Sequence, residues 1–302
     1  MSKPITISKD KLKAQISTSG AELISLQYKQ QEYIWQADPS YWGRHAPILF
    51  PIVGSLRNNE AQSAAGICHM SRHGFARDKN FEIQDLSADH LSLELKSGPQ
   101  TLAVYPYHFC LVISYALETN DATRANTLRQ SFTVTNTGNE DMSFCLGGHP
   151  AFNIPAPKDQ GLWEDYELIF SKPWTYESPI VTQGGLWDYS TKVPVVCNTD
   201  HLALSRDLFA HDTIELEGTP DNTVTVGCKQ AKPYLRVDFP GFSHLGIWSA
   251  GGQDGRAPFL AIEPWCGTAT RTDEDDIFEH KQDILVATAG QSVTRSFSIT
   301  LL

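Results

Sequence analysis

Three short stretches, far apart in the chain, each place one proton-carrying side chain among glycine, proline and aromatic residues. They read S-R-H-G-F-A-R around His73, G-G-H-P-A-F around His149 and I-E-P-W-C-G around Glu263. Two histidines and one glutamate can serve as a general acid and base set, provided that the fold brings them together. Such a set moves protons to and from a substrate without a metal or cofactor.

The surroundings of His73 favour a role beyond that of an ordinary loop histidine. Gly74 permits a close approach of the backbone, and Arg72 and Arg77 supply fixed positive charge nearby. The alternative interpretation is a histidine that lies in a turn and only faces water. His73 is therefore informative only together with the other two stretches.

His149 follows a predicted strand that ends in two glycines. Gly147 and Gly148 leave the backbone open to a ligand, and Pro150 fixes the direction in which the chain leaves. The alternative interpretation is a bulged strand end with an incidental histidine.

Glu263 follows the apolar run 259–262, so we expect it at the end of a buried strand. Partial burial of a carboxyl group raises its pKa toward the range that is useful for a general base. Trp265, two residues later, offers an apolar wall or a stacking face for a sugar ring. The alternative is a glutamate at a strand end that faces water.

Other chemical patterns are incomplete. Cys68 and His69 with His73 lack a second pair of ligands at the spacing of a metal site. The acidic run 273–276 lacks the glycine and the terminal glutamate of a calcium loop. No G-x-S-x-G motif, P-loop or dinucleotide fingerprint occurs, so acyl, phosphoryl and hydride transfer lack their usual parts. We predict neither a metal nor a cofactor.

The composition is typical of a globular cytoplasmic protein. The chain has 302 residues, of which 41% are hydrophobic and 20% charged, and its net charge of −11 argues against nucleic acid or a membrane surface as a partner. Its six cysteines are scattered without C-x-x-C spacing, which is typical of reduced thiols. The N-terminus has no apolar signal core, and the apolar run 46–53 is too short to cross a bilayer. We expect a monomer or homodimer with a small-molecule partner.

The elements that must position these side chains are mainly short strands. The alternation of apolar and polar residues, with turn residues between, predicts strands at 11–17, 22–28, 32–36, 81–86, 90–96, 110–117, 128–135, 142–146, 223–227, 234–239, 244–249, 259–263 and 293–301. Helical turns are predicted at 38–42 and 204–210, a helix start at 272–278, an edge strand or buried connection at 46–53, and irregular structure at 155–202. No segment keeps a helical period for long. We predict one domain over residues 1–302, a large antiparallel β-sandwich.

Taken together, the three stretches resemble the aldose 1-epimerase (galactose mutarotase) family, and within it the LacX-like bacterial branch. Their order and approximate spacing are those of that branch, and P-I-L-F-P-I-V-G at 47–54 and L-G-I-W-S at 245–249 match it as well. The resemblance runs over most of the chain. It implies a large β-sandwich of the galactose mutarotase type that interconverts the α and β anomers of a free aldose without a cofactor.

The resemblance also assigns roles to individual residues. Glu263 is expected to be the general base that takes the proton of the C1 hydroxyl, and His149 the general acid that protonates the ring oxygen. His73 is expected to bind and polarise the same region. Further substrate contacts are expected from Trp248, Trp265 and Asp212.

One departure from the branch concerns an arginine. The glycine that matches Gly54 is usually followed by an arginine that reaches the substrate, whereas this chain has Ser55. Arg57 lies two residues on, and alternate residues of a strand share a side, so Arg57 could reach the same volume. Otherwise Arg77 carries the contact, or the preferred sugar differs.

Three alternatives remain open at this point. Arg57, Arg72 and Arg77 could clamp the phosphate of a hexose 6-phosphate. A β-sandwich that binds or senses carbohydrate without turnover would keep the cleft but would not need an acid and base pair. A glycoside hydrolase would need two carboxyl groups roughly 5–10 Å apart, with Asp212 as the partner of Glu263.

Overall fold

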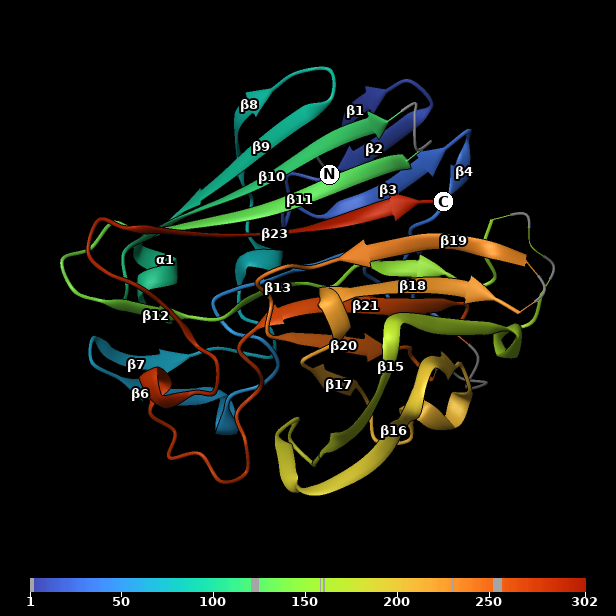
Figure 1. Cartoon of the computed structure of the whole chain (residues 1–302). Coiled ribbons are helices and arrows are strands. Elements are labelled where there is room, and N and C mark those ends of the chain that lie inside the picture. The colour runs from blue at the N-terminus through green and yellow to red at the C-terminus, as the bar shows by residue number, and fades with distance from the viewer. Residues whose placement is uncertain (1–2, 121–124, 158, 160, 230, 252–256) are drawn as a thin grey trace.

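The computed structural model describes residues 3–120, 125–157, 159, 161–229, 231–251 and 257–302, and it consists mainly of antiparallel strands (Figure 1). The largest sheet has nine strands in the order β16-β15-β18-β19-β23-β11-β10-β9-β8. These strands are β8 (Glu82–Leu86), β9 (His90–Lys96), β10 (Phe109–Asn120), β11 (Ala125–Asn136), β15 (Tyr166–Val181), β16 (Trp187–Ala203), β18 (Thr223–Cys228), β19 (Ala231–Asp238) and β23 (Ser292–Leu301).

A second sheet carries the site and has the order β17-β20-β21-β13-β5, with β14 paired to the far part of β21. Its strands are β5 (Ile48–Leu49), β13 (Leu146–Gly148), β14 (Ala151–Asn153), β17 (Ile214–Glu217), β20 (His244–Trp248) and β21 (Phe259–Cys266). The predicted apolar connection at 46–53 thus supplies an edge strand, as proline within the run requires.

Smaller elements complete the chain. The four-stranded sheet is β1 (Ile5–Lys9), β2 (Leu12–Ile16), β3 (Leu23–Tyr28) and β4 (Gln31–Glu32), and two further pairs are β6 (Glu60–Ser63) with β7 (Gly66–His69) and β12 (Met142–Phe144) with β22 (Leu285–Ala287). The short helices are α1 (Pro99–Leu102), η1 (Arg57–Asn59), η2 (Ala76–Asp78), η3 (Trp163–Asp165), η4 (Arg206–Phe209), η5 (Pro220–Asn222) and η6 (Phe278–His280).

The two large sheets pack through one hydrophobic core. That core contains Phe132 and Ile299 from the nine-stranded sheet and Ile247 and Ile262 from the six-stranded sheet. Since side chains alternate between the faces of a strand, the neighbours of Ile262 in β21 point away from this core. The predicted antiparallel β-sandwich is confirmed, and Glu263 and Trp265 lie on the outer face of its six-stranded sheet.

The C-terminal strand β23 lies in the interior of the nine-stranded sheet, between β19 and β11 (Figure 1). Its inward side chains Phe297, Ile299 and Leu301 are buried. On its outer side, serine and threonine hydroxyls pair with those of β11, as Thr294 does with Thr133 at 3.0 Å. The alternation that predicted a strand at 293–301 is confirmed.

The prediction of irregular structure at 155–202 is wrong for most of that segment. Residues 166–203 form a hairpin of a 16-residue and a 17-residue strand, β15 and β16, which curves along the lower part of Figure 1. Four register shifts interrupt its pairing, and much of its surface is exposed. Its side chains therefore lack a steady buried alternation, the signal from which strands are predicted.

The predicted helix start at 272–278 is also wrong. These residues form turns, and only a short helical turn follows at Phe278–His280. Asp276 has a positive φ of 62° and its carboxylate binds Arg57, while Asp275 accepts a hydrogen bond from the backbone N–H two residues later. Aspartate favours such local bonds over a helix interior.

Three smaller predictions had different outcomes. The strand expected at 32–36 is limited to the end of β4, and residues 38–42 form a turn without a helix. The helical turn expected at 204–210 is present as η4.

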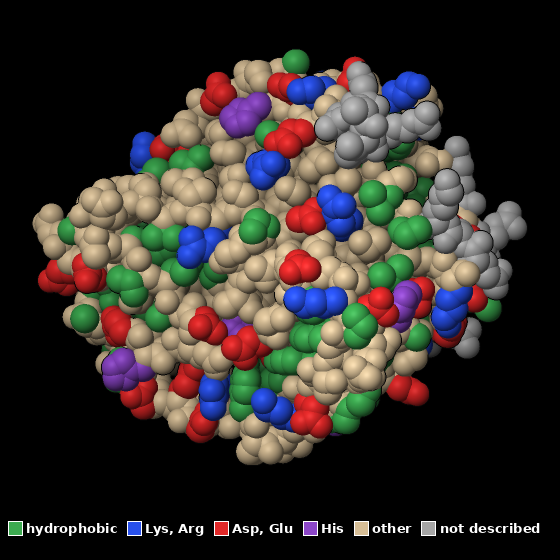
Figure 2. All heavy atoms as spheres, viewed as in Figure 1, with side chains coloured by type: hydrophobic (Ala, Val, Ile, Leu, Met, Phe, Trp, Pro, Cys, Tyr) green, Lys and Arg blue, Asp and Glu red, His purple; other side chains and the backbone are tan. Residues whose placement is uncertain are grey.

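On the face seen in Figure 2, acidic and basic side chains are scattered among hydrophobic and uncharged ones. Within the described ranges, no helix has the length and apolar character needed to cross a membrane.

Candidate active site

Glu263 lies within β21, and the flanking strands make room beside it. It is 1% exposed, and its register partner on β20 is Gly246. The indole of Trp265 lies over Gly246, where a Cβ atom would come within 2.1 Å of the ring. Gly147, opposite Trp265 on β13, is under a similar constraint from that indole at 2.8 Å. Glycine on both sides of β21 is what allows a tryptophan to lie flat beside the carboxylate.

His149 faces Glu263 from the connection between β13 and β14. Its backbone N–H donates to the carbonyl of Pro47 at 3.1 Å, which holds the residue against the edge strand. Its Nε2 lies 3.2 Å from Oε1 of Glu263, and both side chains are almost fully buried. The ring of Trp42 stacks on the imidazole with centroids 4.7 Å apart, and Trp248 meets it edge-on at 5.6 Å.

His73 completes the set from a turn. Its φ is +68°, and two hydrogen bonds join it to Gly54: its backbone N–H donates to the Gly54 carbonyl, and its Nδ1 accepts the Gly54 N–H at 3.1 Å. A nitrogen that accepts a hydrogen bond carries no proton, so a neutral His73 carries its proton on Nε2. The ring meets His149 edge-on at 5.7 Å.

Burial lowers the pKa of both histidines of the site and raises that of Glu263. It lowers the pKa of His149 to about 3, with nearby Arg77, Arg44 and Arg72 acting in the same sense. Burial likewise lowers the pKa of His73 well below its usual value.

The pKa of the Glu263 carboxyl group shifts in the opposite direction. Burial raises the pKa of Glu263 well above its ordinary range, against a smaller opposing effect of the Trp265 indole. Since His149 Nε2 faces this carboxyl group, the empty pocket favours a carboxylic acid beside a neutral imidazole. The pair then holds one mobile proton.

Charged and apolar side chains form the rest of a pocket with about 780 Å³ of empty space, its open mouth included. Arg72 donates to Ser55 Oγ at 3.3 Å and lies 3.4 Å from Asp212. Arg77 donates to the Arg72 carbonyl at 2.6 Å, and its buried Nε has no hydrogen-bond partner among the described residues, with the Asp78 carboxylate 4.0 Å away. Gly185, at the tip of the β15–β16 hairpin, packs against the Arg72 guanidinium.

The structure brings most of the predicted site residues together. The lining of this pocket includes all three candidate acid–base residues and four of the predicted contacts: His73, His149, Glu263, Arg77, Asp212, Trp248 and Trp265. Glu263 lies inside β21, three residues before its end, rather than at the strand end that was expected.

The prediction for Arg57 needs correction. Its Nε donates to both carboxylate oxygens of Asp276 at 3.0 and 2.9 Å, and its Nη2 donates to backbone carbonyls of the 271–274 loop. Residues 57–59 form a short helical turn instead of continuing a strand, so Arg57 does not share the side of Ser55. Arg72, held by the Ser55 hydroxyl, brings a guanidinium to this wall of the pocket instead.

Two parts of the pocket were missed from the sequence. Trp42 lies in a turn remote from the three stretches, and no spacing connects it with His149. The end of the β15–β16 hairpin contributes Val181, Gly185 and Trp187, but the hairpin itself was not predicted. The pair Gly184-Gly185 was the available signal, because adjacent glycines often mark a turn where backbone approaches another group closely.

Among the described residues, one group of side chains has the spacing of metal ligands. It consists of Glu215, Glu217 and His244, which lie on the site face of the sheet but outside the pocket lining.

Comparison with known proteins identifies a matching family and similar chains. A family model described as aldose 1-epimerase matches residues 3–276. The plasmid-encoded protein LacX of Lactococcus lactis subsp. lactis is 34% identical over 308 residues, which cover 99% of each chain.

Solved structures show the same fold. A galactose mutarotase related enzyme from Lactobacillus acidophilus superposes with a TM-score of 0.89 at 32% identity, covering 99% of this chain and 97% of that chain. A galactose mutarotase-like protein from Lactobacillus casei ATCC 334 gives a TM-score of 0.86 at 29% identity, covering 99% and 100% of the two chains.

Proposed function

This chain belongs to the aldose 1-epimerase family, as an isomerase that acts on carbohydrates, and we propose that it interconverts the α and β anomers of a free aldohexose. The observation that carries the proposal is the buried pair of His149 Nε2 and Glu263 Oε1, 3.2 Å apart in a pocket lined by tryptophan and arginine. Anomer exchange requires one group that takes the proton of the C1 hydroxyl and one that protonates the ring oxygen.

The reaction consists of two balanced proton transfers. The Glu263 carboxylate takes the proton of the C1 hydroxyl, the C1–O1 bond becomes a carbonyl, and the bond from C1 to the ring oxygen breaks. The ring oxygen takes a proton from the His149 imidazolium. Rotation about C1–C2 presents the other face of the aldehyde, and the same transfers in reverse close the ring.

The protonation states of Glu263 and His149 are consistent with this reaction. After ring opening, Glu263 is protonated and His149 neutral, which is the form that burial favours in the empty pocket. The closed ring reacts with the ionised form, reached by moving one proton from Oε1 to Nε2. Trp42 stacked on the imidazole stabilises the positive charge that this transfer creates.

Other pocket residues bind the sugar. Neutral His73, with its proton fixed on Nε2, donates a hydrogen bond to a sugar oxygen near the reacting centre. Asp212 and Arg72 offer an acceptor and a donor for more distant hydroxyls. Trp248 and Trp265 supply apolar faces for ring C–H groups.

The first experiment is polarimetry on freshly dissolved α-glucose and α-galactose with wild type, Glu263→Gln and His149→Asn. We expect wild type to accelerate equilibration and each variant to lose roughly 10²- to 10⁴-fold in kcat/KM. The double variant should lose little more, since the two groups act as a unit. His69→Asn, a histidine with a 64% exposed side chain outside the pocket, is the matched control.

A hexose 6-phosphate is the second candidate substrate. It is favoured by the two guanidinium groups of Arg72 and Arg77, both of which line the pocket. Glucose 6-phosphate should then show a KM at least tenfold below that of glucose, and Arg72→Gln should abolish the difference. Binding of either sugar without turnover would instead favour the non-catalytic, sugar-sensing function.

We place the protein in the cytoplasm as one domain. All six cysteines, each a described residue, are free thiols, which supports a reducing compartment.

A further inference from the structure

A second polar cluster lies beside Trp265, on the face of the six-stranded sheet that also carries Glu263. In the strand register His244 is opposite Trp265, while Glu215 is opposite Gly246, which is in turn opposite Glu263. Directly opposite residues of antiparallel strands share a face. The indole over Gly246 therefore occupies the space between the catalytic carboxyl group and the second cluster.

His244 is the centre of this cluster. Its Nδ1 lies 2.5 Å from Glu215 Oε1, and its Nε2 lies 2.7 Å from Asp283 Oδ2. Tyr176 donates its hydroxyl to the other oxygen of Glu215 at 2.8 Å. The side chains of His244 and Glu215 are completely buried. The network thus ties β20 to β17, to β15 of the hairpin and to the 281–284 loop.

Both ring nitrogens of His244 face carboxyl oxygens, an arrangement that favours the doubly protonated imidazolium. Burial alone would lower its pKa, but the hydrogen bonds to Asp283 and Glu215 and their charges outweigh burial and raise the pKa to about 9. Other ionisable groups around the cluster are Glu217, Tyr176, Tyr189, Arg271 and Cys266.

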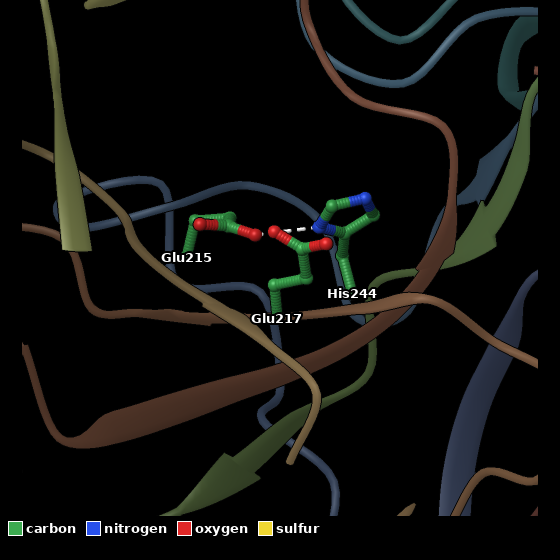
Figure 3. Close-up of side chains that lie close together, drawn as sticks. All are labelled: Glu215, Glu217 and His244. Atoms are coloured by element: carbon green, nitrogen blue, oxygen red, sulfur yellow. Dashed lines mark hydrogen bonds and ion pairs between the residues drawn. The ribbon is translucent and has the colours of Figure 1, made fainter. Parts of the chain in front are cut away.

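The same side chains invite comparison with a metal site. Figure 3 shows Glu215, Glu217 and His244 converging, with potential ligand atoms within 4.8 Å of one another. A metal-bound histidine usually donates its other N–H to a carboxylate, as Nε2 does to Asp283 here. However, Nδ1 already lies 2.5 Å from Glu215 Oε1, so a metal would have to displace both the Nδ1 proton and this contact. A proton supplies the positive charge of this cluster.

We propose that His244 is a positioning residue: its imidazolium, held between Glu215 and Asp283, fixes Trp265 over Gly246 and so sets the pocket wall beside Glu263. This inference rests on the proposed sugar site and identifies what supports one of its walls. Loss of one proton would leave a neutral ring that can donate to only one of the two carboxylates, so β20 would lose its hydrogen bond either to Glu215 or to the 281–284 loop. The Trp265 indole would then no longer be held in place over Gly246.

Asp283→Asn is the primary test variant. Removing the imidazole would leave Glu215 buried without a counter-charge, whereas the Asp283 side chain is 40% exposed and its amide replacement keeps the same shape. The matched control is His201→Gln, which removes a 46% exposed histidine that also lies between two carboxylates, those of Glu167 and Asp200.

The direct readout is ¹⁹F NMR of protein in which the seven tryptophans are 5-fluorotryptophan, with the Trp265 signal assigned by Trp265→Phe. We expect that signal to titrate near pH 9 in wild type and at lower pH in Asp283→Asn, while the control stays like wild type. At pH 8, the KM of Asp283→Asn for the sugar should rise roughly 2- to 12-fold with kcat within about twofold.

Several results would overturn the proposal. A Trp265 signal that does not respond between pH 7 and 10 in folded protein would exclude the coupling. So would a wild-type KM in Asp283→Asn. Stoichiometric Co²⁺ binding with a visible spectrum that depends on His244 would show that a metal holds the cluster. If wild type acts on no sugar, the proposed function fails, and the NMR titration still decides the positioning role.

Discussion

At the residue scale, Glu263 and His149 share one buried environment, which shifts the pKa of the acid and that of the base in opposite directions. Burial disfavours whichever form is charged, so it raises the pKa of the carboxyl group and lowers that of the imidazole. The two groups therefore stay coupled through one proton over a wide pH range. Their activity should be insensitive to pH where an ordinary histidine would titrate.

This coupling predicts the pH dependence of kcat/KM. The acidic limb reports a second proton on the pair and follows the pKa of His149 of about 3, not the usual value near 6.5. We expect kcat/KM at pH 5 to equal that at pH 7 within about twofold, after subtraction of spontaneous mutarotation. The alkaline limb follows loss of the shared proton and lies well above the usual range of a glutamate.

Folding must be checked at each pH, because the same shifts change stability. His149 and His73 have lowered pKa values in the folded state, so the unfolded chain binds protons first below about pH 6.5. Stability therefore falls as the pH drops below that value. Circular dichroism separates this loss from an effect on the chemistry. An inflection of kcat/KM near 6.5 in fully folded protein would contradict the proposed pair.

At the element scale, the long β15–β16 hairpin forms one wall of the pocket with the end where its two strands are joined. Its tip, residues 182–186, is held by the Trp187 backbone, which bonds to Thr270 and Thr272. Gly184 and Gly185 both have positive φ, of 89° and 76°. Only Gly185 meets neighbours: a Cβ there would lie 2.4 Å from Arg72 Nη2 and 2.7 Å from Ser55 Oγ.

Gly185→Ala should therefore displace the Arg72 guanidinium. We expect the KM for the sugar to rise roughly tenfold, about one lost polar contact, with kcat nearly unchanged. Gly184→Ala is the matched control, because it introduces the same backbone strain with nothing within 4 Å of its Cβ. Equal KM values for the two variants, measured by polarimetry over a range of sugar concentrations, would show that the tip does not act through Arg72.

The same hairpin shows where prediction from the sequence fails. Strands such as β9 and β23 bury alternate side chains, Leu91, Leu93 and Leu95 in the first case, and their alternation predicts them. The hairpin instead lies at a sheet edge, contains Pro173, Pro179 and Pro194, and is stabilised by backbone pairing with repeated register shifts. Such pairing leaves little trace in residue types.

The site was predictable to the extent that its chemistry is local. His73, His149 and Glu263 are marked by the glycines, prolines and aromatic residues beside them, which shape the backbone there. Arg57 was misplaced because the direction of a side chain depends on the backbone turn at residues 57–59, which alternation does not reveal. Trp42 was missed because its stacking on His149 arises only in the tertiary structure.

At the scale of the whole molecule, the last strand connects the two halves of the nine-stranded sheet. β23 joins β19 to β11, so the sheet is complete only when residues 292–301 have paired. Its Phe297 is fully buried, and the ring lies so near Gly148 that a Cβ there would come within 2.7 Å. The core thus supports the backbone immediately before His149.

Phe297→Ala should affect stability and activity together. Removing a buried phenylalanine from a core typically lowers the free energy of unfolding by about 3–5 kcal/mol. We also expect kcat/KM to fall, since the cavity removes the support under Gly148. Urea unfolding gives the first quantity and polarimetry in the absence of urea the second.

Ile83→Ala is the control for this variant, because Ile83 is 52% exposed on the edge strand β8. It should change the free energy of unfolding by no more than about 0.5 kcal/mol. A Phe297→Ala protein with the stability of this control would contradict the packing described for β23.

The glycines beside β21 limit how the pocket can be redesigned for a different sugar. Gly147 and Gly246 hold their places because the Trp265 indole fills the space that any side chain would need. A library that also randomised these two glycines, which lie behind the lining residues, would spend much of its diversity on chains in which Trp265 is displaced. Variation should be directed to Val181 and Thr213, which line the pocket from the hairpin and from the segment before β17. The framework strands would then remain untouched while the outline of the binding site changes.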